Sequence, residues 1–233
     1  MCSSDLLIRG AFEYQGQKCS AASRAYIPRS LWASTSELLL ADLESIKVGP
    51  VEDFSNFVNA VIDARSFARV SEYLQFAKES NECQIFYGGG TNGTTGFFVE
   101  PTILVTSNPN FKTMREEIFG PVLTVYIYED DDWNDTLKLA DSTSPFALTG
   151  AVFSKDRYAI EEALNVLRNA AGNFYINDKP TGAVVGQQPF GGSRASGTND
   201  KAGAKLNLLR WVSMRTIKEN FLPPKDYRYP FLG

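Results

Sequence analysis

The sequence predicts an α/β fold in which helices flank a mainly parallel β-sheet. Short apolar segments rich in β-branched residues alternate with longer segments of helical periodicity. Strand, helix and strand in this rhythm imply right-handed crossovers, which place successive strands parallel in one sheet. The chain has 233 residues, 43% of them hydrophobic, without an internal repeat or low-complexity segment. We therefore expect one domain over residues 1–220, followed by a proline-rich tail over residues 221–233.

The first half of the chain predicts three helices and several strands. A short helix over residues 5–14, with Asp5 as N-cap, leads into a turn at Gly16. Ser30 and Asp63 each predict the start of a longer helix, because apolar residues follow them at helical spacing. The predicted strands of this half lie at residues 23–27, 84–87 and 97–105, the last interrupted by Pro101.

The second half predicts the buried centre of the sheet and its later crossovers. Residues 122–128 are apolar and β-branched, which is typical of a buried strand. The acidic run at residues 129–132 predicts a solvated helix start, since carboxylates are favourable at the positive end of the helix dipole. The remaining predicted elements are a helix to Asp141, a strand at 149–154, a helix at 156–168, a strand at 173–177, a helix at 199–209 and a late edge strand at 211–217.

Composition excludes several classes of function. The chain contains no histidine, which excludes Ser-His-Asp and Cys-His catalysis and removes the commonest zinc ligand. Three dispersed cysteines suggest neither disulfides nor a metal site, so a reducing compartment fits them best. The net charge of −4 gives no electrostatic footprint for nucleic acid, and no apolar run has membrane-spanning length. We therefore expect no metal, nucleic-acid or membrane partner. We also expect a cytoplasmic protein, because the first residues match no targeting signal.

Cys19 is the candidate nucleophile. Gly16 permits a positive φ, and such a bend can lift Cys19 out of the regular hydrogen-bond ladder. Lys18 beside it can favour the thiolate. The alternative is a buried cysteine that behaves as a small hydrophobe, which is the commoner case for a free cysteine. Two further stretches favour the nucleophile, namely Glu116 to Pro121 and Gln187 to Gly197.

With these stretches the chain resembles the aldehyde dehydrogenase superfamily. Gly16 to Cys19 match its Gly-Gln-x-Cys nucleophile motif, and Glu117 to Pro121 match its Glu-x-Phe-Gly-Pro motif. The run from Gly172 to Gly192 is similar to that of the pyrroline-5-carboxylate dehydrogenase branch, which oxidises glutamate γ-semialdehyde to glutamate. The resemblance covers almost the whole chain but only the later, catalytic part of a full-length family member.

The resemblance implies a site for a small carboxylated aldehyde or its cyclic imine. Cys19 would attack the aldehyde and give a thiohemiacetal, with its own backbone N–H as one donor to the oxyanion. Gly182 and Ala183 would donate backbone N–H groups to the substrate carboxylate, because small residues allow a close approach. Ser20 would add a hydroxyl donor, and Phe190 would pack on the aliphatic part. The alternative for this glycine-rich loop is chain reversal alone.

The resemblance also implies two residues that face a cofactor. Glu117 would hold a ribose hydroxyl of NAD, and Phe119 would pack on its nicotinamide side. The alternative is a structural loop before a strand. No Gly-x-Gly-x-x-Gly follows a strand, and the family's nucleotide-binding domain lies upstream of the nucleophile. We therefore expect no Rossmann domain and no useful NAD binding by the isolated chain, although the parent family uses NAD.

Three functions follow from this pattern. The leading expectation is a non-redox enzyme that keeps the aldehyde pocket and promotes imine formation, cyclisation or condensation. The alternative is a catalytic fragment of an NAD-dependent semialdehyde dehydrogenase, for which the mitochondrial matrix becomes possible. The third is a non-catalytic partner of a full-length homologue. In each case we expect a homo-oligomer, because the predicted late strand at residues 211–217 is an apolar edge.

Overall fold

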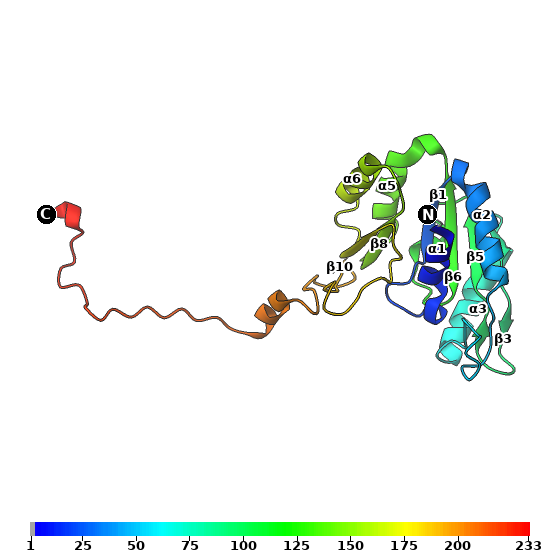
Figure 1. Cartoon of the computed structure of the whole chain (residues 1–233), viewed down its shortest axis with the longest axis horizontal. Helices are drawn as coiled ribbons and strands as arrows, with labels where there is room; N and C mark the ends of the chain where they lie inside the picture. Colours follow the sequence, from blue (N-terminus) through cyan, green and yellow to red (C-terminus); the bar gives the residue numbers. More distant parts are fainter. Residues whose placement is uncertain (1–2) are drawn as a thin grey trace.

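The computed structural model describes residues 3–233 and has a four-stranded sheet at the centre of its larger part (Figure 1). The strand order is β1-β6-β5-β2. β1, β6 and β5 run parallel, whereas β2 is antiparallel to β5. The sheet is therefore mixed, with an antiparallel edge strand on an otherwise parallel sheet. The strands span Arg24–Pro28 (β1), Cys83–Tyr87 (β2), Thr102–Thr106 (β5) and Val122–Tyr128 (β6).

Helices cover both faces of this sheet. α1 (Ser3–Phe12) and α2 (Arg29–Glu44) pack on one face, and α3 (Ala64–Glu79) packs on the other. Successive residues of β5 point to opposite faces, so Ile103 packs with α1 and α2 while Leu104 packs with α3. Both side chains are fully buried, and burial of such a side chain stabilises a fold by about 1.5–3 kcal/mol.

Some helices are capped by a neighbouring residue, and others by a residue far away in the sequence. Asp63 caps α3 as predicted, since its carboxylate accepts a hydrogen bond of 2.7 Å from the Ser66 backbone nitrogen. The prediction of Asp5 as an N-cap is wrong, because α1 begins at Ser3 and Asp5 lies in its first turn. Ser30 is not a cap either, because it lies within α2. Its backbone nitrogen donates to the Asp130 carboxylate at 3.1 Å, across 100 positions of sequence.

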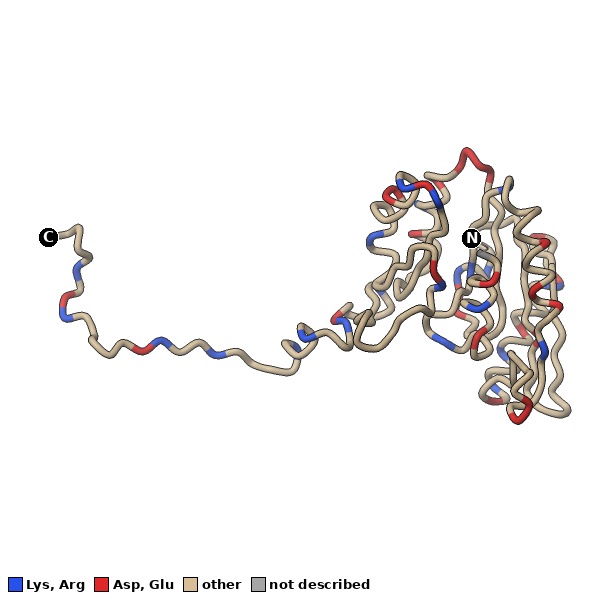
Figure 2. The backbone as a smooth tube through the Cα atoms, in the orientation of Figure 1, with Lys and Arg blue, Asp and Glu red and all other residues tan. Residues whose placement is uncertain are grey.

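A smaller part of the chain follows β6. The acidic loop that joins the two parts is solvent-exposed, as predicted, and is visible as the red arch at the top of Figure 2. Here α5 and α6 pack against a parallel pair, β8 and β9, around Leu137, Val152, Ile160 and Ala163. These elements span Trp133–Ser142 (α5), Thr149–Val152 (β8), Arg157–Val166 (α6) and Asn173–Ile176 (β9).

Several short elements complete the chain. Two antiparallel ladders pair β3 with β4 and β7 with β10. Over residues 3–233 no helix has the length and apolar character that crossing a bilayer requires. The short elements are η1 (Glu13–Gly16), β3 (Thr91–Asn92), β4 (Phe98–Val99), α4 (Lys112–Arg115), η2 (Asp130–Asp132), β7 (Phe146–Ala147), β10 (Ser193–Arg194), η3 (Lys205–Trp211) and η4 (Pro230–Leu232).

The prediction of a helix at residues 199–209 is wrong, and the edge strand predicted at residues 211–217 stays a prediction. Asn199, Lys201 and Gly203 all adopt positive φ, which is incompatible with a right-handed helix, and only the 3₁₀ helix η3 forms. The residues after η3 form an extended arm that leaves the body of the molecule (Figure 1). A strand needs a neighbour for its backbone groups, and the arm has none within residues 3–233. The boundary at residue 220 stays a prediction.

Candidate active site

The candidate nucleophile stands on a left-handed turn. α1 runs into η1, where Tyr14, Gln15 and Gly16 have φ angles of 56°, 56° and 63°. The positive φ expected for Gly16 is thus confirmed, and two non-glycine residues share it. Such residues cost about 1–3 kcal/mol each and persist only where surrounding contacts hold them. Gln15 is held in this way, since it is buried and its amide contacts Asn59. Cys19 follows this turn with an exposed thiol.

The two sequence motifs touch each other at their glycines. A Cβ atom on Gly16 would lie 2.3 Å from the carbonyl oxygen of Gly120, so no larger residue fits there. A Cβ atom on Gly120 would in turn lie 2.5 Å from Cγ2 of Val70. Phe119 precedes this contact with a φ of 58°, another non-glycine residue in the left-handed region. The turn that carries Cys19 is therefore seated directly on the loop that carries Glu117 and Phe119.

A cavity of about 540 Å³ brings part of the predicted site together. Cys19, Glu117 and Phe119 all line it, and so does Pro180 at the start of the predicted carboxylate-anchoring loop. Residues 23–28 along β1 and residues 149–151 of β8 also line it. Four predicted site residues do not line the cavity, namely Ser20, Gly182, Ala183 and Phe190.

The predicted anchoring loop is partly committed to its own turn. The backbone N–H of Gly182 donates to the carbonyl oxygen of Lys179 at 3.1 Å. Ala183 is exposed, and its N–H has no acceptor among residues 3–233. Asp178 brings a carboxylate to the same turn, since Oδ2 would lie 2.9 Å from a Cβ atom on Gly182. A ligand carboxylate at this loop would therefore depend on nearby cations to offset the charge of Asp178.

Ser20 and Phe190 do not line the cavity, and each takes part in hydrogen bonds through its backbone. Ser20 is buried, and its carbonyl oxygen accepts a hydrogen bond of 3.3 Å from Oγ1 of Thr149 in β8. Phe190 exchanges two backbone hydrogen bonds with Ala202, of 2.9 and 2.8 Å. Next to that bridge, the Lys201 ammonium donates to the carbonyl oxygen of Gly191 at 2.9 Å. The roles inferred for Ser20 and Phe190 remain predictions.

Cys19 and Cys83 lie in different surroundings. Burial raises the pKa of the Cys83 thiol to about 11, so it is protonated at neutral pH. Cys19 is exposed, and in the described part of the chain its backbone N–H has no hydrogen-bond acceptor. An unpaired N–H beside a nucleophile is available to an oxyanion. Cys2 lies outside the described residues.

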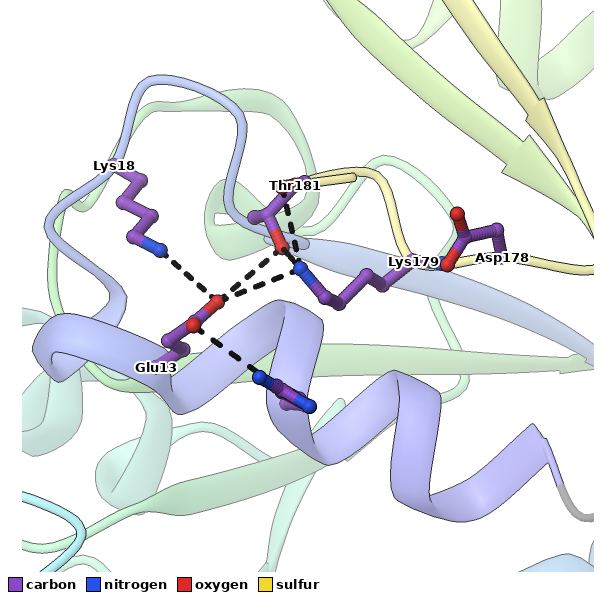
Figure 3. A network of polar contacts seen from close by, with 6 residues as sticks. Glu13, Lys18, Asp178, Lys179 and Thr181 are labelled. Carbon is purple, nitrogen blue, oxygen red and sulfur yellow. Dashed lines mark hydrogen bonds and ion pairs between the residues drawn. The ribbon is translucent and has the colours of Figure 1, made fainter. Parts of the chain in front are cut away.

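Lys18 is directed away from the role predicted for it. The sequence predicts that Lys18 favours the Cys19 thiolate. In the structure its ammonium instead lies 2.9 Å from Oε2 of Glu13 (Figure 3). Burial alone would raise the pKa of Glu13, but the Lys18 hydrogen bond and the charges of Lys18, Lys179 and Arg9 bring it below its ordinary value. Among these contacts only Arg9–Glu13 has the i,i+4 spacing that predicts a pair on a helix, whereas Lys18 follows the end of α1 and Thr181 lies 168 positions away.

Comparison with known proteins identifies the family. Residues 3–217 match the family model described as "Aldehyde dehydrogenase family". The chain is 61% identical to the mitochondrial delta-1-pyrroline-5-carboxylate dehydrogenase of Dictyostelium discoideum over 225 residues, and 55% identical to that of Homo sapiens over 226 residues. Each alignment covers 97% of this chain and 40% of the relative. The chain thus spans about two fifths of the length of these relatives.

A solved structure supports the same assignment. The delta-pyrroline-5-carboxylate dehydrogenase from Mycobacterium tuberculosis, bound with NAD, superposes with a TM-score of 0.87 at 48% identity. That alignment covers 99% of this chain and 42% of the other. The fold, both motifs and the family model agree, and the chain belongs to the aldehyde dehydrogenase family.

Proposed function

We propose that this chain is the nucleophile-bearing part of an NAD-dependent dehydrogenase for glutamate γ-semialdehyde, the open form of 1-pyrroline-5-carboxylate. The observation that carries the proposal is the seating of the Cys19 turn on the Glu117–Gly120 loop, beside one cavity of about 540 Å³. Relatives at 50–61% identity carry the name of this enzyme, which supports the choice of substrate.

The residues of this chain suit the acceptor side of such a reaction. The Cys19 thiolate adds to the aldehyde carbon, and the Cys19 N–H stabilises the oxyanion of the thiohemiacetal. Glu117 and Phe119 line the same cavity and would hold the nicotinamide half of NAD, which accepts the hydride when bound. Loss of that hydride leaves a thioester on Cys19. Water then releases the carboxylic acid and restores the thiol.

The comparisons favour the fragment interpretation over the non-redox enzyme that the sequence favoured. The relatives share 97% of this chain, but the chain spans only 40% of their length. Nothing in the geometry favours condensation or a purely regulatory role. Several of the relatives are named mitochondrial, and we extend that location to this protein in place of the expected cytoplasm.

A chimaera provides the test. The 225 matching residues of the Dictyostelium enzyme are replaced by this chain, and NADH absorbance is followed with 1-pyrroline-5-carboxylate. We expect NADH production, and we expect Cys19→Ser to reduce it by on the order of 10³-fold or more. The matched control is Cys83→Ser, which should keep the activity. A folded chimaera that binds NAD but produces no NADH would contradict the proposal, as would an active Cys19→Ser variant.

A further inference from the structure

Glu13 is the centre of a charged cluster that joins two segments far apart in sequence (Figure 3). Its Oε2 lies 2.9 Å from the Lys18 ammonium, 3.7 Å from the Lys179 ammonium and 3.5 Å from Oγ1 of Thr181. Its Oε1 lies 3.9 Å from Nε of Arg9. One carboxylate therefore connects the residue before Cys19 with the two residues that bracket Pro180.

Lys179 is well placed to shape the predicted anchoring loop. Only 17% of its side chain is exposed, so its ammonium needs partners within the protein. Besides approaching Glu13, it donates to the carbonyl oxygen of Thr181 at 3.3 Å and to Oγ1 of Thr181 at 3.1 Å. Lys179 thereby closes the turn that immediately precedes Gly182 and Ala183.

Packing brings the same loop onto the nucleophile helix. A Cβ atom on Gly10 of α1 would lie 3.1 Å from Cδ of Pro180 and 3.6 Å from Cβ of Lys179. The loop thus rests on the helix that delivers Cys19, one turn before Glu13. The helix before Cys19 and the loop at Lys179–Thr181 are therefore joined twice, by close packing at Gly10 and by the Glu13 carboxylate.

We propose that Glu13 is a positioning residue that fixes the carboxylate-binding loop at Gly182–Ala183 relative to Cys19. The inference rests on the proposed function, because it assumes that this loop holds the carboxylate of the substrate. Glu13 does not touch the reacting atoms. Its carboxylate holds Lys18 on the nucleophile turn and both Lys179 and Thr181 on the loop.

Charge-dependent alkylation of Cys19 tests the inference on the full 233-residue chain. The probes are 5-iodopentanoate and its neutral amide, 5-iodopentanamide. In both, the Cys19 sulfur displaces iodide from a carbon four bonds from the carboxyl carbon, the same separation as in glutamate γ-semialdehyde. The acid-to-amide ratio of rate constants, with adducts mapped to Cys19, reports how well the loop holds a carboxylate. We expect a ratio of about tenfold in the unchanged chain, the scale of one charge-assisted hydrogen bond.

Glu13→Gln should bring this ratio close to one, because the amide keeps the shape but loses the ion pairs. Simple electrostatics predicts the opposite, since removal of a negative charge would strengthen attraction of the anionic probe. An unchanged or increased ratio in Glu13→Gln therefore overturns the inference. Thr181→Val, which removes a neutral contact of the same carboxylate without changing any charge, should also lower the ratio, and it keeps the test decisive if Glu13→Gln fails to fold.

Arg9→Gln is the matched control. This substitution removes a positive charge that faces the Glu13 carboxylate, but Arg9 is exposed and does not contact the loop. Its ratio should stay within about twofold of the unchanged chain, because exposed pairs contribute little. A loss of ratio equal to that of Glu13→Gln would overturn the inference. Absence of any acid preference in the unchanged chain would count against the substrate class itself, and the two failures are therefore distinguishable.

Discussion

The nucleophile turn at residues 13–20 and the segment after β9, at residues 178–233, are held by different kinds of interaction. The turn is fixed by backbone crowding, since Gly16 lies against Gly120 with no room for a side chain. The later segment is attached near its start by Lys179, whose ammonium approaches Glu13, and further along by Lys201, which donates to the carbonyl oxygen of Gly172, while its arm is exposed. The nucleophile side of the site is therefore fixed by close backbone packing, whereas the carboxylate side depends on an ion pair between segments far apart in sequence.

Two glycines with positive φ allow the largest test of this contrast. Gly16→Ala should lower the free energy of unfolding by about 3 kcal/mol or more, because left-handed strain adds to a clash with Gly120. Gly186→Ala, in the later segment, should cost only about 1–2 kcal/mol, since no atom lies within 4 Å of its Cβ position. Urea denaturation measures both. Equal costs would mean that crowding does not distinguish the two regions.

Thiol reactivity tests the turn directly. We expect iodoacetamide at pH 8 to label Cys19 about 100-fold faster than Cys83, because the Cys83 pKa of about 11 leaves few thiolates. Labelling of Cys83 should rise about tenfold per pH unit up to that pKa. Peptide mapping by mass spectrometry gives both rates. Preferential labelling of Cys83 at pH 8 would contradict the nucleophilic role of Cys19.

Removal of the arm tests the later segment. Trp211, Met214 and Ile217 are 80%, 82% and 72% exposed, which is unusual for a monomer. We predict that the full chain forms a homo-oligomer through this arm, and that a chain ending at Ala204 is monomeric. Light scattering at micromolar concentration measures both masses. The free energy of unfolding of the shortened monomer should match that of the diluted full chain within about 1 kcal/mol. A monomeric full chain would contradict the prediction.

The smallest expected effect is the pH dependence of the stability that Glu13 gives to the loop. The folded-state pKa of Glu13 lies below its ordinary value of 4.5. Its contribution to the free energy of unfolding is therefore complete above about pH 4.5 and is lost as pH falls through the folded-state value. The contribution should be below about 1 kcal/mol, because the group is partly exposed. Native-state proteolysis at residues 183–188 should therefore accelerate below pH 4.5. In Glu13→Gln the acceleration should be absent.

Sequence reasoning succeeded where causes were local. The spacing of apolar residues located the strands of the main sheet, and the glycines of two motifs located the turn at Cys19 and the loop at Glu117 and Phe119. It failed where causes were distant. The cap of α2 comes from Asp130, 100 positions from Ser30, and Glu13 meets Thr181, 168 positions later in the chain. Periodicity and residue spacing do not predict contacts between segments that are far apart in the sequence.

The cap of α2 has a consequence for the order of folding. Asp130 follows β6, while Ser30 follows β1, so their hydrogen bonds form only after the two parallel strands have aligned. α2 therefore gains its cap late, when a loop of 100 positions has closed. Asp130→Ala should then accelerate unfolding and leave the refolding rate nearly unchanged, a φ-value near zero in stopped-flow kinetics. The start of this helix would thus report on the completion of the sheet.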